Sequence, residues 1–171
     1  MQTLDGNIYA GVVTCVAGDA KFRQDAGWAI NWGAATFPAG LGVQDGANIP
    51  VTAGTYLIIF DRTTGAYSFQ TDYTVTYQVD ITGYLAGGAT LNANGIRVGG
   101  NFGDFGASVA AGAMASWSPS DANSAMTDLG NNIWSITVSY PVASLGATTI
   151  RPNTALPRTC RSPCGLVVLI P

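Results

Sequence analysis

Short runs of β-branched and aromatic residues, each closed by a turn-forming sequence, constrain the fold of this chain most strongly. Tyr73–Ile81 (YTVTYQVDI) shows the pattern best, because its apolar residues recur at every second position. Successive side chains of a strand point to opposite faces, so this alternation gives one apolar face and one polar face. No long stretch keeps a helical period. The pattern predicts an all-β fold, and within that class a β-sandwich.

Turn sequences set the limits of the other predicted strands. Arg62-Thr63-Thr64-Gly65 separates two apolar runs and is typical of a hairpin turn. A short helix is expected at two places only, within Ala107–Ala115 and after Ser118-Pro119. The remaining strands are expected at 8–15, 20–23, 55–61, 66–69, 96–98 and 133–140.

Composition excludes several classes of partner. Hydrophobic residues make up 47% of the chain and charged residues 10%, which is typical of a packed globular protein. The net charge is −3 and the cations form no basic cluster, which argues against nucleic acid as a partner. No apolar run reaches the length of a membrane span, and the residues after Met1 show no export signal.

A weak internal repeat divides the chain. Residues of the segment that begins at Leu4 recur at a constant offset of 125, and the matching pairs are Leu4 and Leu129, Asn7 and Asn132, Ile8 and Ile133, and Val13 and Val138. Two tandem modules are therefore expected, with their boundary near Gln70–Tyr73. The first module is assigned to 1–71 and the second to 72–149.

Residues 150–171 form an atypical tail. This segment holds three of the seven cations, four of the eight prolines and two of the three cysteines. Two prolines and the lack of alternation make residues 151–158 a poor strand. We expect either a tail foreign to the module, such as a truncation or a shifted reading frame, or an ordinary terminal linker.

A candidate binding segment begins at Lys21. Phe22 has the pattern of the buried residue of a short strand, so Lys21 and Arg23 point to the opposite face. Outward cations on a strand often serve only solubility. Such cations indicate a ligand-binding site only when they lie beside an exposed aromatic ring.

Two tryptophans follow in what the glycines predict to be a loop. Trp28 and Trp32 have little core to enter there, although Trp32, between Asn31 and Gly33, also fits a residue that closes the end of a sandwich. An indole offers a flat apolar face to a sugar ring, and lysine, arginine and asparagine side chains bond its hydroxyls. Asn31 has the simpler alternative of closing a turn. The candidate carbohydrate-binding residues are Trp28, Trp32, Lys21, Arg23 and Asn31.

The residue types needed for most catalytic and metal sites are missing. The chain contains no histidine, which removes a Ser-His-Asp triad and a zinc site of the usual kind. Cys15, Cys160 and Cys164 are odd in number and give no disulfide framework. We expect no enzyme activity, no cofactor and no metal.

Two stretches resemble one bacterial family. Residues 21–69, with the sequence KFRQDAGWAINWG near their start and GTYLIIFDRTTGAYSF at their end, resemble the Ig-like and starch-binding modules of SusE/SusF-type outer-membrane proteins of Bacteroidetes. Residues 75–141, which include IRVGGNF and WSPSDANSAMTDLGNNIWSITVSYP, resemble the front half of a further module of this type. Against this family the first module lacks its opening strands and the second lacks its back half.

The resemblance carries expectations about function. It implies tandem Ig-like, starch-binding-like β-sandwich modules, both incomplete, that bind α-glucan without converting it. It also implies a place at the cell surface or outer membrane, or secretion, and a parent protein that works with an outer-membrane transporter. The alternative is a structural Ig-like spacer or adhesion module of a secreted multi-domain protein.

Overall fold

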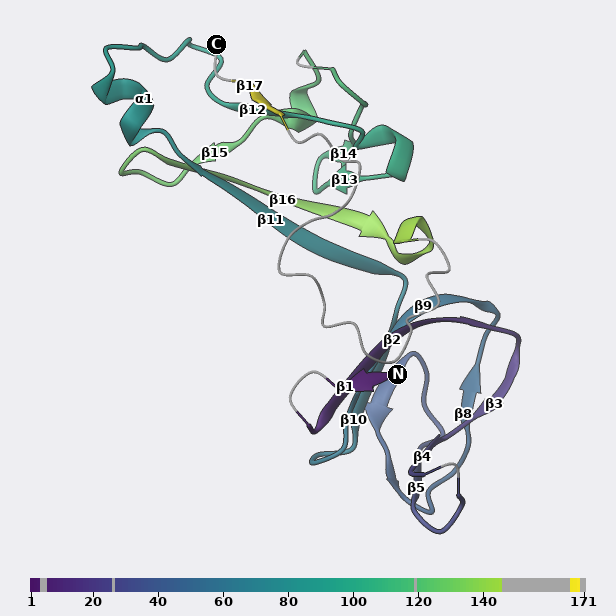
Figure 1. Cartoon of the computed structure of the whole chain (residues 1–171). Helices are drawn as coiled ribbons and strands as arrows, with labels where there is room; N and C mark the ends of the chain where they lie inside the picture. Colours follow the sequence, from purple (N-terminus) through teal and green to yellow (C-terminus); the bar gives the residue numbers. More distant parts are fainter. Residues whose placement is uncertain (4–5, 26, 119, 146–166, 170–171) are drawn as a thin grey trace. The chain divides into compact units, whose positions relative to one another are not determined.

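A computed structural model of the chain provides its fold (Figure 1). The structure describes residues 1–3, 6–25, 27–118, 120–145 and 167–169. Antiparallel strands make up most of the regular structure, which confirms the all-β, sandwich-like prediction. The described residues form two compact units, one over 1–73 with Leu145 and one over 74–144 with 167–169. Each unit has its own sheets.

The larger sheet of the first unit has the strand order β1-β2-β9-β10-β6. β2 pairs with β9 over its whole length, from Ile8 opposite Asp61 to Cys15 opposite Gly54. The strands expected at 8–15, 55–61 and 66–69 are thereby confirmed. The five strands are β1 (Gln2–Thr3), β2 (Ile8–Cys15), β6 (Ala39–Leu41), β9 (Gly54–Asp61) and β10 (Ala66–Gln70).

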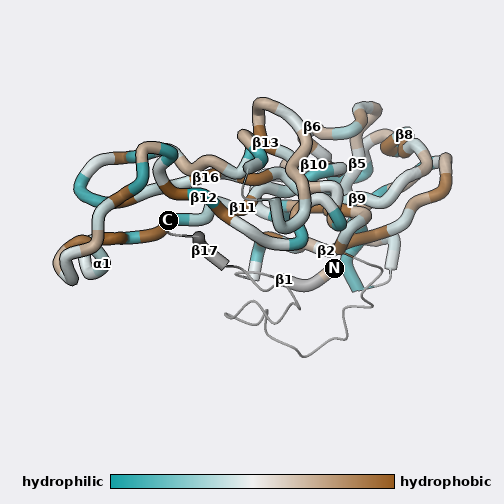
Figure 2. The backbone as a smooth tube through the Cα atoms, turned by 90° about the horizontal axis from the view of Figure 1, so that it is seen from above, coloured by the Kyte–Doolittle hydropathy of each residue, from teal (hydrophilic) through white to brown (hydrophobic). Residues whose placement is uncertain are grey.

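Two smaller sheets complete the first unit. β3 (Gly18–Ala20) pairs with β8 (Ile49–Val51), which Figure 2 colours as hydrophobic. A three-stranded sheet has the order β4-β5-β7, with β4 (Phe22–Arg23), β5 (Asn31–Gly33) and β7 (Val43–Gln44). The prediction of a loop was wrong for Trp32, which lies in β5 opposite Phe22 of β4.

The core of the first unit follows from strand alternation. In β9 the side chains of Tyr56, Ile58 and Phe60 are buried while their neighbours are half-exposed, and β10 buries Tyr67 and Phe69 in the same way. Ile49 and Val51 of β8 complete this buried cluster, against which Phe22 and Trp32 of the small sheet pack. The aromatic core therefore holds β4 and β5 in place.

The hairpin turn predicted between β9 and β10 is present. The carboxylate of Asp61 accepts hydrogen bonds from the backbone N–H of Thr63 (2.8 Å) and from the hydroxyl of Thr64 (2.8 Å). These bonds, the Thr64 hydroxyl first, lower the pKa of Asp61 from its ordinary value. Gly65 closes the turn with φ of 77°, where a Cβ would collide with the carbonyl oxygen of Gly42.

The second unit is built on β11 (Asp72–Asp80) and β16 (Ile133–Pro141), which pair with each other. The alternation predicted for 73–81 is confirmed, because the residues of β11 are alternately exposed and half-buried and Ile81 is fully buried. The other strands of this unit are β12 (Arg97–Gly99), β13 (Ser108–Val109), β14 (Gly112–Ala113), β15 (Thr127–Asp128) and β17 (Val167–Leu169).

Of the two helical segments expected from the sequence, the one after Ser118-Pro119 is present as the 3-10 turn η2 (Ala122–Ser124), and the other is absent. The segment Ala107–Ala115 holds the β13–β14 hairpin, so the helix expected there was wrong. Gly112 at φ of 141° supplies a conformation that a helix excludes, and Ala107 and Met114 anchor the hairpin in the core. The helical segments are α1 (Thr82–Ala86) and the 3-10 turns η1 (Gly103–Phe105), η2 (Ala122–Ser124) and η3 (Val142–Leu145).

The two units share one hairpin geometry. In each, a two-residue strand pairs antiparallel with the start of a long strand, β1 with β2 and β15 with β16. All partners are related by the offset found in the sequence, since Gln2 faces Ala10, Thr3 faces Tyr9, Thr127 faces Ser135 and Asp128 faces Trp134. The repeat is therefore a repeat of backbone pairing as well as of residues.

Several expectations fall outside the described residues. These are the character of the tail up to residue 166 and the states of Cys160 and Cys164. Cys15 is a free, half-buried thiol whose pKa is raised by burial. In the described part of the chain, no helix is long and apolar enough to cross a membrane.

Candidate functional site

The β4–β5 ribbon and the loop that joins its strands form the candidate site. The loop is closed by backbone hydrogen bonds from Gln24 N–H to Ile30 O (2.9 Å) and from Gly27 N–H to Gln24 O (3.0 Å). Both strands are seated on the aromatic core, since Phe22 and Trp32 pack against it. The loop therefore has a fixed base.

Trp28 and Arg23 lie together on the outside of this ribbon. Trp28 is 65% exposed, more than any other tryptophan among the described residues. The guanidinium carbon of Arg23 lies over its ring, 4.9 Å from the ring centroid. A guanidinium at this distance is attracted to the aromatic face. An exposed indole with hydrogen-bond donors beside it is the arrangement that the sequence predicted for these two residues.

Asn31 lies beneath the exposed surface. Only 5% of this residue is exposed, and its amide nitrogen donates to the carboxylate of Asp45 (2.7 Å) and to the backbone oxygen of Trp28 (3.0 Å). Its side-chain oxygen accepts a hydrogen bond from the ammonium group of Lys21 (3.2 Å). Asn31 thus ties the loop to Lys21, directly before β4, and to Asp45, directly after β7.

Trp32 faces the interior. It is half-buried, and its ring centroid lies 5.4 Å from that of Phe60. Phe60 in turn stacks on Phe22 with ring centroids 4.3 Å apart and an interplanar angle of 8°. Trp32 is therefore part of an aromatic wall.

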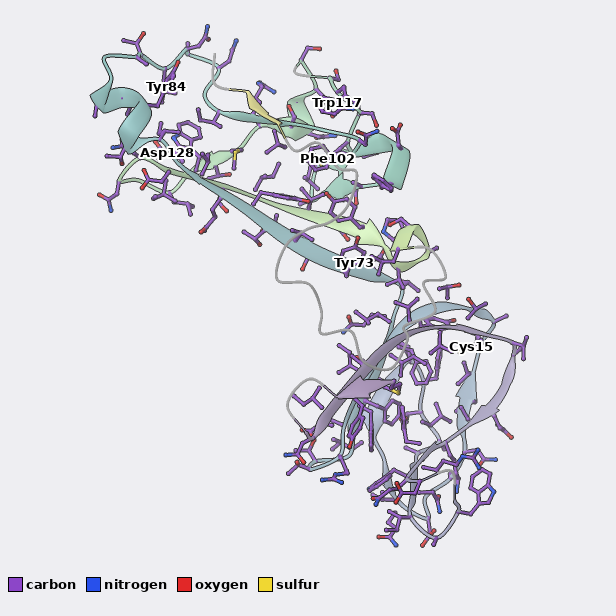
Figure 3. The ribbon with its side chains drawn as sticks, in the orientation of Figure 1. Cys15, Tyr73, Tyr84, Phe102, Trp117 and Asp128 are labelled. Carbon is purple, nitrogen blue, oxygen red and sulfur yellow. The ribbon has the colours of Figure 1, made fainter. Side chains whose placement is uncertain are left out.

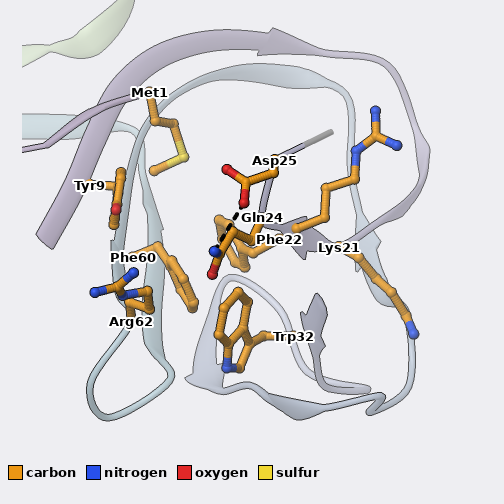
Figure 4. A pocket seen from close by; sticks show the side chains of 10 residues that line it. Met1, Tyr9, Lys21, Phe22, Gln24, Asp25, Trp32, Phe60 and Arg62 are labelled. Atoms are coloured by element: carbon orange, nitrogen blue, oxygen red, sulfur yellow. Dashed lines mark hydrogen bonds between the residues drawn. The ribbon is translucent and has the colours of Figure 1, made fainter. Parts of the chain in front are cut away.

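A hollow of about 410 Å³ opens in front of this wall. Figure 4 shows Trp32, Phe60 and Tyr9 around it, while the ammonium end of Lys21 points away. Its polar rim includes Gln24, Asp25 and Arg62. All three cations of residues 1–73 contribute to its lining, namely Lys21, Arg23 and Arg62.

Sequence reasoning missed the polar rim of the hollow. Gln24 and Asp25 lie directly after β4, and the side-chain nitrogen of Gln24 donates to the Asp25 carboxylate (3.0 Å). Tyr9 and Arg62 come from strand β2 and from the hairpin turn after β9. The pairing of β2 with β9 brings them to the site, and no local sequence pattern predicts that pairing partner.

The second unit holds one further exposed indole. Trp117 is 49% exposed, and its indole N–H donates to the side-chain oxygen of Asn101 (2.8 Å). Asn101 donates in turn to Asp104 (2.8 Å). Figure 3 labels Trp117 and the buried Phe102 of this unit. This indole is fixed by polar contacts to residues of its own unit.

Chemical groups for metal binding do not gather at the site. Within the described residues, no group of three or more cysteine, aspartate or glutamate side chains could hold a metal ion. The site offers aromatic faces, hydroxyl and amide groups, and cations. Such a set can bind a polar ring by stacking and hydrogen bonding.

Comparison with known proteins adds no further information on identity. No protein-family model, no curated protein and no solved structure matches the chain.

Proposed function

We propose that the first unit binds carbohydrate without converting it, and that the indole of Trp28 is the stacking surface. The observation that carries the proposal is the exposure of Trp28 at 65%, beside the guanidinium of Arg23. An exposed indole with a guanidinium beside it offers an apolar face and hydrogen-bond donors together, which is what a sugar ring packs on.

Rigidity of the loop supports the proposal. Asn31 bonds the backbone oxygen of Trp28, so the loop is held before a ligand arrives. A preformed surface loses less conformational entropy on binding than a mobile one. In this proposal Asn31 positions the indole, because its own amide already has three partners.

Two cations supply the hydrogen bonds. Arg23 lies over one side of the indole, so the sugar ring takes the other side and its hydroxyls meet the free guanidinium N–H groups at the ring edge. Lys21 gives one bond to Asn31 and retains further donors for a sugar hydroxyl. Trp32 belongs to the wall of the hollow and acts separately.

The glycan class and the cellular setting rest on the sequence motifs alone. The resemblance of residues 21–69 to SusE/SusF-type modules favours an α-glucan as the ligand. It also favours a parent protein at the bacterial cell surface that works with an outer-membrane transporter. A shallow site of this kind binds weakly, with a dissociation constant on the order of millimolar to tens of micromolar.

A titration with maltoheptaose tests the proposal. The indole N–H signals of the four tryptophans are followed by NMR and assigned with single Trp→Phe variants. The signal of Trp28 should shift in a saturable manner, and Trp28→Ala should abolish the effect at residues of the loop. Leu41→Ala, which changes an exposed residue of β6, is the matched control and should bind as the unchanged protein does.

An unchanged Trp28 signal in a folded protein would contradict the proposal. That result would favour the alternative function, a structural spacer or adhesion module.

A further inference from the structure

We propose that the hollow in front of Trp32 is a second sugar site, which seats a single terminal sugar ring of the glycan. This inference rests on the proposed carbohydrate binding and extends it from a flat surface to a pocket. The hollow measures about 410 Å³, within the range of small-molecule sites. Residues of β2, β4, β5 and β9 line it, so it suits the end of a chain better than the middle.

The wall of the hollow provides the apolar contact. Trp32 and Phe60 are tilted against each other at 55° with centroids 5.4 Å apart, and Phe22 lies flat on Phe60. Phe60 is buried and held by the core, so the wall cannot turn away. A pyranose ring has an apolar C–H face that packs on such a surface.

Unused hydrogen-bonding groups stand on the same wall. Within the described residues, neither the hydroxyl of Tyr9 nor the indole N–H of Trp32 forms a hydrogen bond, and both side chains are only half-buried. Water satisfies these groups in the absence of a ligand. A sugar hydroxyl can replace that water because it both donates and accepts.

A carboxylate acceptor and a guanidinium donor line the rim of the hollow. Asp25 presents a carboxylate that is oriented by the Gln24 amide (3.0 Å). Its backbone has φ of 52°, a conformation that is uncommon for residues other than glycine and is tolerated by aspartate and asparagine. Arg62 stands at the rim as well, with its guanidinium fixed to the Asn7 side chain (3.2 Å). Donors and an acceptor around an apolar wall match the mixed hydroxyls of a neutral sugar.

The experiment uses a ligand of one ring and a ligand of several. Methyl α-D-glucopyranoside should shift the indole N–H signal of Trp32 in the complete chain and leave that of Trp28 nearly unchanged. Maltoheptaose should shift both signals. Trp28→Ala should leave the response of Trp32 to the single ring intact.

Two conservative variants test the assigned hydrogen bonds. Tyr9→Phe removes only a hydroxyl, and Asp25→Asn keeps the shape and the backbone preference while it removes the charge. Tyr9→Phe should weaken binding of the single ring by about three- to tenfold, the usual effect of losing one hydrogen bond, and Asp25→Asn should weaken it by a similar factor because an amide oxygen is a weaker acceptor than a carboxylate. Asp72→Asn, at an exposed carboxylate that does not line the hollow, should have no effect.

The outcomes separate the two proposals. A shift of Trp28 with maltoheptaose and no shift of Trp32 with either ligand would overturn the pocket and leave the proposed function standing. A shift of Trp32 that neither Tyr9→Phe nor Asp25→Asn weakens would overturn the assigned hydrogen bonds. A titration in which no indole signal moves would overturn both proposals.

Discussion

Phe22 of β4 and Phe60 of β9 lie face to face, with ring centroids 4.3 Å apart and an interplanar angle of 8°. This pair joins the ribbon that carries Trp28 to the larger sheet of the first unit. The position of the candidate site therefore depends on core packing as well as on the loop itself.

Replacement of Phe22 should destabilise the first unit. Phe22→Ala removes the stacked ring and leaves a cavity beside Phe60, so the free energy of unfolding should fall by about 3 kcal/mol. Urea unfolding followed through backbone amide NMR signals of residues 1–73 measures the change. Leu41→Ala, at a side chain that is 65% exposed, should change it by less than about 0.5 kcal/mol. Equal effects of the two variants would show that the stack contributes nothing.

Gly33 should be irreplaceable in β5. A Cβ at this position would collide with the backbone oxygen of Ala47, and backbone atoms cannot move aside as the end of a side chain does. Gly33→Ala should therefore destabilise the first unit by about 1–3 kcal/mol and shift the signal of the neighbouring Trp32. Gly83→Ala is the matched control, because a Cβ there meets no atom within 4 Å. Wild-type stability of Gly33→Ala would refute the close approach.

Asp121 should make the second unit sensitive to acid. Its carboxylate accepts hydrogen bonds from the backbone N–H groups of Ala115 (2.7 Å) and Asn123 (3.0 Å), and these bonds, with the charge of Arg97, lower its pKa. A carboxyl group with a lowered pKa in the folded state stabilises that state above the unfolded pKa, near 3.9, and loses this contribution as the pH falls through the folded value.

The variant Asp121→Asn isolates this effect. The unfolding free energy of the second unit should fall below about pH 4 in the unchanged protein. The difference between the two proteins should be largest near neutral pH and should shrink towards low pH. Urea unfolding at a series of pH values measures it. A difference that stays constant with pH would contradict the role assigned to the charge. Subtraction of the two curves removes the contributions of Asp61 and Asp80, whose pKa values are also lowered.

Asn101 should protect the exposed indole N–H of Trp117 from hydrogen exchange with solvent. It accepts the indole N–H of Trp117 at 2.8 Å, so Asn101→Ala should free that group to exchange with solvent. Hydrogen exchange of the four indole N–H signals measures the rate. The Trp117 signal should exchange several-fold faster in the variant, while that of Trp134 stays unchanged. An unaltered Trp117 rate would mean that the bond gives no protection.

Alternation and turn chemistry made much of the fold predictable from the sequence. The strand expected at 8–15 has those limits in the structure, and the turn after Asp61 closes through the predicted Thr-Thr-Gly sequence. Very short strands were harder to predict, because β5 and β7 are too short to show a period. Tertiary packing on Phe60 decides that Trp32 is in a strand and not in a loop.

The candidate site was predictable only where its residues are neighbours in the sequence. Lys21, Arg23 and Trp28 stand within one short segment, and Arg23 and Trp28 do meet in space. Tyr9 and Arg62 reach the hollow through the pairing of β2 with β9, a contact between distant parts of the chain. Strand propensity and the spacing of residues in the sequence carry no information about which strands pair with each other.

In the closed loop between β4 and β5, the side chain exposed to solvent is not one of the groups that hold the loop in place. Among the described residues of the loop, the groups that hold it are backbone atoms of Gln24, Gly27 and Ile30 and the side chain of Asn31, and the side chain of Trp28 forms none of these hydrogen bonds. The exposed position can therefore be exchanged for other aromatic or polar residues without rebuilding the scaffold. A library randomised at Trp28 and Ala29 should keep the native backbone and vary only in what it recognises.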